Sequence, residues 1–322
     1  MEPIRIPNIR FNSELASTII ELERVRARLH QHTRTDPPLY DDLRKLFQNL
    51  SNIMSARIEG NRTTVLDALQ GVREGQSHDE GVQEILNLEK ASAYIDEAVT
   101  EEFIFTEMFI RELHALAVSG LDREGDTTPG SYRSTEVRIA QTAHRPPGPE
   151  SVPADMRELV EFMNESMSPQ YHLLQVAIVH HRFVWIHPFG NGNGRVSRLL
   201  TYAMLVKLGF TSASGYRALN PTVVFGSDRQ AYYEHLSIAD SLRDEDIEKW
   251  CLYVLHGVAS DMKNILDLSS SAFVLNELYG PALEKAYDEA LLTGKEVAVL
   301  LKIADSGEVS AGDVKDLLPG SS

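Results

Sequence analysis

The sequence has a single cysteine and a shortage of positive charge. With Cys251 alone, no disulfide is possible within the chain, so we expect a reducing, cytoplasmic setting. Lys and Arg number 31 against 47 Asp and Glu, a net charge of −16, and this acid excess argues against nucleic acid as a partner. No stretch approaches the roughly 18 uncharged apolar residues of a membrane span, and residues 1–20 lack the pattern of a signal peptide. We therefore expect no membrane partner.

Helical periodicity dominates what is present. Apolar residues recur three and four positions apart over residues 43–58, which predicts a helix with one buried face that ends at Gly60. Similar patterns predict further helices at about 13–30, 78–99, 104–118, 153–167, 171–186, 194–208, 227–242, 244–267 and 270–291.

One region departs from the helical pattern. Residues 132–142 alternate, with Val137 and Ile139 two apart, and run into a Pro-Pro-Gly-Pro segment at 146–149. Alternation followed by such a loop predicts a small β-hairpin or flap. The fold class is therefore mainly α with one small β-hairpin flap.

The most informative stretch is His187-Pro-Phe-Gly-Asn-Gly-Asn-Gly-Arg-Val-Ser-Arg198. Its alternating glycines expose backbone N–H groups, and a helix follows whose first turns carry Arg195 and Arg198. Positive charge at the positive end of a helix dipole is unfavourable unless an anion binds there. The stretch therefore indicates a polyphosphate site, although a plain turn with a packed histidine and solvated arginines has the same composition.

This stretch resembles the signature of the Fic family, His-Pro-Phe-x-Asp/Glu-Gly-Asn-Gly-Arg with a second arginine three residues on. Gly130-Ser-Tyr-Arg133 matches the start of the family's flap, and Ala231-Tyr-Tyr-Glu matches its segment near the nucleotide base. The resemblance covers about residues 40–255 and implies a Fic-type helical bundle.

The resemblance implies a protein adenylyltransferase, which transfers AMP from ATP to a Ser, Thr or Tyr hydroxyl of a target protein. His187 would be the general base, since a histidine titrates near neutral pH. The target would bind along the flap, and a homodimer is left open. The implied ATP-binding residues are Asn191, Gly192, Asn193, Gly194, Arg195, Arg198, Ile139, Ala140, Gln141, Thr142, Tyr232 and Tyr233.

One position departs from the family pattern. Asn191 stands where the family usually carries the acidic residue that helps to hold Mg²⁺. An amide oxygen ligates a hard cation without negative charge, so weaker use of Mg²⁺, or use of Mn²⁺, is expected at Asn191.

A second motif ends the helix of about 41–60. Ser55-Ala-Arg-Ile-Glu59-Gly60 resembles the family's inhibitory motif, Ser/Thr-x-x-x-Glu-Gly/Asn, whose glutamate pairs with the second arginine of the anion loop. Ser55 and Glu59 share a helix face, and a glutamate at a helix C-terminus favours a cationic partner elsewhere. The resemblance implies that Glu59 pairs with Arg198 and keeps it from the γ-phosphate.

The expected organisation has three parts. Residues 1–100 form an N-terminal helical region, 101–257 the Fic catalytic core, and 258–322 a helical part that resembles the opening of a winged-helix module cut short. Two alternatives to AMP transfer remain. One is removal of AMP, or transfer of another phosphate-containing group, on the same loop; the other is a regulatory module that binds nucleotide with little turnover.

Overall fold

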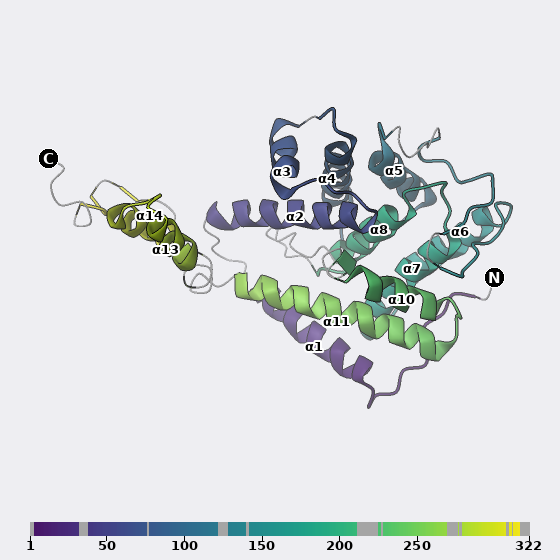
Figure 1. Ribbon diagram of the computed structural model, residues 1–322. Helices are drawn as coiled ribbons and strands as arrows, with labels where there is room; N and C mark the ends of the chain where they lie inside the picture. The colour runs from purple at the N-terminus through teal and green to yellow at the C-terminus, as the bar shows by residue number, and fades with distance from the viewer. Residues whose placement is uncertain are drawn as a thin grey trace.

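The computed structural model describes residues 3–31, 38–75, 77–121, 128–139, 142–210, 225–226, 228–268, 276, 279–306, 309–310 and 312–315. Figure 1 shows a helical protein, as predicted. The helices are α1 (Glu14–Gln31), α2 (Pro38–Ile58), α3 (Val65–Glu74), α4 (Glu80–Ala98), α5 (Glu107–Val118), α6 (Val152–Asn164), the 3₁₀ helix η2 (Pro169–Tyr171), α7 (His172–Ile186), α8 (Asn193–Lys207), α10 (Arg229–Ala239), α11 (Asp244–Leu268), α13 (Gly280–Asp288) and α14 (Gly294–Ser306).

The centre of the bundle is the pair α7 and α8. Both helices are buried on nearly all sides, and their buried residues include polar and charged side chains such as His180, Arg195 and Arg198 as well as apolar ones. Helices α6 and α11 pack against α7, while α4 and α5 pack against α8. The loop that joins α7 to α8, residues 187–192, is therefore positioned by two buried and closely packed helices.

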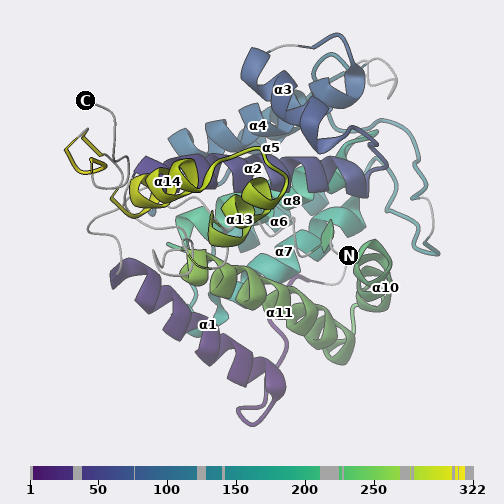
Figure 2. The same cartoon turned by 60° about the vertical axis from the view of Figure 1, so that its left-hand side comes forward.

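The N-terminal helices share this core. One hydrophobic cluster contains Leu15 of α1, Ile53 of α2, Ile85 of α4 and Met262 of α11. Helix α1 packs along α11, as Figures 1 and 2 show from two sides. The division into a region of 1–100 and a core of 101–257 remains a prediction, since the apolar cluster runs through both.

Two elements differ from expectation, the flap and helix α3. Within the described residues the flap, 128–139 and 142–150, is extended and irregular and contains no strand, because its backbone bonds go to Arg133 and the loop after α7. Helix α3 had no expected counterpart, and it begins at Thr64, whose side chain accepts from Asp67 N, and ends at Gly75 with φ 73°.

The start of the expected helix at 270–291 lies outside the described residues and remains a prediction. Helix α13 covers only Gly280–Asp288, and residues 269–275 lie outside the described part. Helix α14 follows at Gly294–Ser306, residues 312–315 form a turn, and residues 316–322 lie outside the described part. In Figure 1, α13 and α14 lie apart from the bundle.

Candidate active site

The segment after α7 places His187 at the edge of the bundle. His187 caps the helix in a left-handed conformation, with φ 52° and ψ 61°, which is uncommon for a residue with a side chain. Arg133 holds this backbone: its Nε donates to His187 O at 2.8 Å, and its backbone N donates to Pro188 O at 2.9 Å. Arg133 also donates to the carbonyls of Ile186 and Pro147, so one buried side chain ties the flap to the base-bearing turn.

The imidazole of His187 is held in one orientation. Its Nδ1 lies 3.2 Å from Val184 O, and a carbonyl accepts only, so Nδ1 carries the proton and Nε2 has a lone pair. Burial lowers the pKa of His187 to about 4, against the smaller opposing effects of the Val184 hydrogen bond and the Glu59 charge. The ring is therefore neutral at physiological pH, as a general base must be.

Buried side chains shape the anion loop, residues 187–194, from within. Phe189 is fully buried and stacks on His114 of α5, with ring centroids 3.8 Å apart. His114 Nδ1 accepts from Gly130 N at 2.9 Å, which joins the loop to the start of the flap. Asn193 accepts from Phe189 N at 3.0 Å and donates to Phe189 O at 2.9 Å, so its side chain closes the loop. The expectation that Asn193 holds phosphates remains a prediction, and its observed bonds favour a structural contribution.

Glu59 lies over the front of this loop. Its Oε1 accepts from Arg198 Nη2 at 2.7 Å, while Arg198 Nε donates to Ser55 Oγ at 2.9 Å and Nη2 donates to Ser55 O at 3.1 Å. A Cβ placed on Gly194 would overlap Glu59 Oε1, so the carboxylate rests directly on the first turn of α8. The expected Glu59–Arg198 pair is thus present, and a carboxylate rests at the N-terminus of α8, where the helix dipole favours an anion.

The electrostatics of this pair are mutual. Burial alone would raise the pKa of Glu59, but the charge and hydrogen bond of Arg198, with Arg195 and His187 contributing less, lower it. Burial would lower the pKa of Arg198, and the Glu59 charge raises it instead. Both groups are therefore charged at neutral pH, and the pair is an ion pair rather than a neutral hydrogen bond.

Arg195 faces the other side of the loop. Its Nη1 lies 3.2 Å from Glu84 Oε1 and 3.4 Å from Ala117 O, and both the arginine and the glutamate side chains are 3% exposed. A Cβ on Gly192 would come within 3.4 Å of Arg195 Nη2, so the guanidinium lies behind the loop. The expectation that Arg195 clamps phosphates remains a prediction, which this position does not favour.

The remaining predicted residues are distributed unevenly. Tyr232 is buried among Phe225 and Trp250, and its hydroxyl lies 2.9 Å from His180 Nε2, so it is a core residue with its polar end next to Arg198. Tyr233 is half-buried beside it, with ring centroids 5.3 Å apart, and remains a candidate wall for the base. Ile139 and Thr142 are partly exposed on the flap, and Ala140 and Gln141 lie outside the described residues.

The residues present do not form a metal site held by the protein. Asn191 supplies only a neutral amide, and the carboxylate closest to the loop, Glu59, pairs with Arg198. Among the described residues there is no group of three or more His, Cys, Asp or Glu side chains arranged to hold a metal ion. Magnesium commonly binds through a carboxylate together with substrate phosphates. This set of donors does not fit a resident metal ion, so a cation would enter the site bound to the phosphates of the nucleotide substrate.

Sequence reasoning missed two residues of this site. Glu84 carries no motif of its own, because a lone glutamate on an amphipathic helix looks like a solvated one. His114 has the same difficulty, although a buried histidine opposite an aromatic ring is visible once α5 is placed.

In the part of the chain that the structure describes, no helix is long and apolar enough to cross a membrane.

Comparisons with known proteins agree with this site. The Fic/DOC family profile matches residues 104–205. Two curated relatives named protein adenylyltransferase Fic, from Drosophila grimshawi and Drosophila mojavensis, are each 32% identical over 194 residues, which is 58% of this chain and 37% and 35% of theirs. The chain thus spans little more than a third of the curated relatives that it matches.

Solved structures show the same fold. A Fic family protein from Desulfovibrio desulfuricans aligns over 99% of this chain and 87% of its own, with a TM-score of 0.65 and 22% identity. Fic-1 from C. elegans aligns over 80% of this chain and 74% of its own, with a TM-score of 0.62 and 19% identity. The His187–Arg198 loop on the α7–α8 pair lies within residues 104–205, the part of the chain that matches the Fic/DOC family profile.

Proposed function

We propose that this chain transfers AMP from ATP to a hydroxyl side chain of a target protein, and that Glu59 inhibits the transfer. The observation that carries the proposal is the first turn of α8, where a carboxylate sits on the helix N-terminus and pairs with a buried arginine at 2.7 Å. Curated relatives named as adenylyltransferases support the reaction class.

The proposed reaction needs one base and a set of phosphate ligands. Nε2 of neutral His187 takes the proton of the target hydroxyl, and the hydroxyl oxygen attacks the α-phosphorus of ATP. The bond between the α-phosphorus and the bridging oxygen breaks, and pyrophosphate leaves. The N–H groups of Gly192 to Gly194 and the guanidinium of Arg198 stabilise the phosphate charge.

The proposed inhibition is a competition for one cation. Arg198 is 1% exposed and its Nε and Nη2 donate to Ser55 and Glu59, so these donors are not available to a γ-phosphate while Glu59 stays in place. The Glu59 side chain is 32% exposed, which leaves it a way out toward solvent. Displacement of Glu59 would free Arg198 and the N-terminus of α8 together.

The test is covalent labelling with ATP that carries ³²P at the α-phosphate, in the presence of cell lysate and of Mg²⁺ or Mn²⁺. We expect Glu59→Gly to label itself or lysate proteins more strongly than the unchanged chain does. Label should vanish when His187→Ala is added, and it should persist with His172→Ala, a histidine at the far end of α7 whose Nε2 bonds Met167 O.

The outcomes separate the alternatives. The label on the target is released as AMP by phosphodiesterase if AMP was transferred, whereas another phosphate-containing group gives another product. Loss of label from a pre-labelled target, with Glu59 required, would indicate AMP removal instead. Nucleotide binding without any covalent label under either metal would contradict transfer and favour the regulatory module.

A further inference from the structure

The carboxylate of Glu84 joins two parts of the site. Glu84 belongs to α4, and the residue as a whole is 2% exposed. Its Oε1 lies 3.2 Å from Arg195 Nη1, behind the anion loop, and its Oε2 accepts from Asn61 Nδ2 at 2.8 Å. A buried carboxylate is stable only when paired and hydrogen-bonded, so these two partners are held firmly on either side of it.

Asn61 is the residue that follows the Glu59–Gly60 turn. Its backbone N donates to Ala56 O at 3.1 Å, and its Oδ1 accepts from Thr63 N at 2.8 Å. Its Nδ2 also donates to Gly81 O at 2.8 Å, beside Glu84. With the backbone N and both side-chain polar atoms of Asn61 engaged, the end of α2 has a defined position relative to α4.

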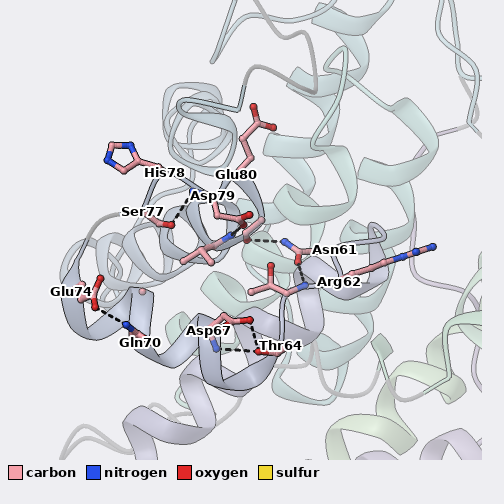
Figure 3. Close-up of a pocket in the computed structure, with 14 residues that line it drawn as sticks. Asn61, Arg62, Thr64, Asp67, Gln70, Glu74, Ser77, His78, Asp79 and Glu80 are labelled. Carbon is pink, nitrogen blue, oxygen red and sulfur yellow. Dashed lines mark hydrogen bonds between the residues drawn. The ribbon is translucent and has the colours of Figure 1, made fainter.

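Asn61 lies where its hydrogen bonds make a specific contact between the end of α2 and α4. Figure 3 shows its side chain on the wall of a groove of about 770 Å³, whose lining comes from the segment after α2, from α3 and from the start of α4. Asn61 is 9% exposed, and the end of α2 also packs through Ala56 and Ile58, so the side-chain bonds of Asn61 add directional contacts to a packed turn. Gly60, which has a φ of 99°, carries no side chain that would restrict the backbone at this turn.

We propose that Glu84 and Asn61 are positioning residues that align the inhibitory Glu59 with the anion loop. Glu84 fixes Arg195, and with it the loop, on one side; through Asn61 it fixes the Glu59 turn on the other. This inference rests on the proposed function only for the effect of Glu59 on catalysis. The alignment of Glu59 with the anion loop also affects ATP binding, which is measurable without turnover.

The first test is Asn61→Ala in the full chain. Loss of its hydrogen bond to a charged group should weaken the docked position of Glu59, so we expect labelling to rise about 5–30-fold. In the Glu59→Gly background the same change should alter labelling less than about twofold, because no inhibitory carboxylate is left to misplace. Asn164→Ala is the matched control: Asn164 also bonds backbone N–H and C=O groups, of Phe105, but has no contact with the site.

The second test is Glu84→Gln in the Glu59→Gly background. Arg195 then lacks its counter-charge, so the loop should lose its alignment and the KM for ATP should rise about tenfold, with a smaller change in kcat. A purely structural effect would lower the amount of active protein and leave KM unchanged. An unchanged KM, or an Asn61→Ala chain that labels no faster than the unchanged chain, would overturn the proposal.

ATP affinity keeps this inference separate from the proposed function. Fluorescent ATP-analogue titration of Asn61→Ala should show tighter binding than the unchanged chain, since Arg198 is released more often. Tighter binding without any labelling in Glu59→Gly would support the alignment and contradict the transferase. Labelling in Glu59→Gly with no effect of Asn61→Ala on either binding or labelling would leave the transferase standing and overturn the alignment.

Discussion

Arg195 and Arg198 lie three residues apart on the first turns of α8, and each pairs with a glutamate from the N-terminal helices. The two pairs differ in their surroundings. The side chains of Arg195 and Glu84 are both 3% exposed and lie behind the loop. Arg198 is 1% exposed, but its partner Glu59 is 32% exposed at the end of α2. A carboxylate enclosed on all sides serves as part of the scaffold, whereas one with a path to solvent can be exchanged for another anion.

The largest expected effect concerns the base beside these pairs. In the Glu59→Gly background, His187→Ala should lower kcat by about 10²–10⁴-fold, the usual contribution of a general base, without changing the affinity for ATP. Single-turnover labelling and equilibrium binding of an ATP analogue measure the two quantities separately. A His187→Ala chain that labels at an undiminished rate would show that the loop only binds nucleotide.

The next effect tests the contrast itself. Removing a charge from the enclosed pair, with Glu84→Gln, should lower the free energy of unfolding by about 3–5 kcal/mol, because Arg195 remains buried without a counter-charge. Glu59→Gln should cost about 1 kcal/mol or less, since water and dissolved anions replace the carboxylate. Urea unfolding of both variants measures the difference, and equal losses would remove the distinction between a scaffold pair and an exchangeable pair.

A pH profile sharpens the same picture. A histidine whose pKa is lowered stays neutral as pH falls, and loses its function as a base only when pH falls through the lowered value of about 4. Between pH 8 and 5, kcat/KM of Glu59→Gly should therefore change less than about twofold on account of His187. An unperturbed histidine would lose about 30-fold over that range. A decline centred near pH 6.5 would contradict the buried, neutral base.

The smallest effect is expected from the C-terminal part. Helices α13 and α14 contact chiefly each other, and among the described side chains the hydrophobic cluster extends as far as Met262. A chain that ends at residue 268 should keep both arginine pairs and melt within about 2 °C of the full chain. A larger drop in Tm would show that residues beyond 268 support the bundle.

Much of this fold follows from local rules. Helices α4 to α8 match their predicted ranges within about three residues, because long amphipathic or wholly apolar segments with clear ends admit few alternatives. Helix α3 escaped prediction because its ten residues include Gly71, which weakens a helical pattern. The flap was predicted as a hairpin from its alternation, but Arg133 takes its carbonyls instead of a second strand.

The site divides in the same way. The anion loop and the Glu59–Arg198 pair were predictable because each lies in a recognisable run of residues, and the structure confirms that pair. Glu84 and the hidden position of Arg195 were not, because burial of a charged side chain depends on distant segments that the local sequence does not specify. Tyr232 and Asn193 likewise combine a motif position with bonds that only packing reveals.

The central claim is that Glu59 and the γ-phosphate of ATP compete for Arg198. Isothermal titration of the unchanged chain and of Glu59→Gly with ATP and with AMP tests this most directly. We expect Glu59→Gly to bind ATP at least about tenfold more tightly, because the γ-phosphate no longer competes with one charge-assisted hydrogen bond to Arg198. The affinity for AMP should not change. Equal affinities for ATP in the two chains would contradict the claim and separate the Glu59–Arg198 pair from nucleotide binding.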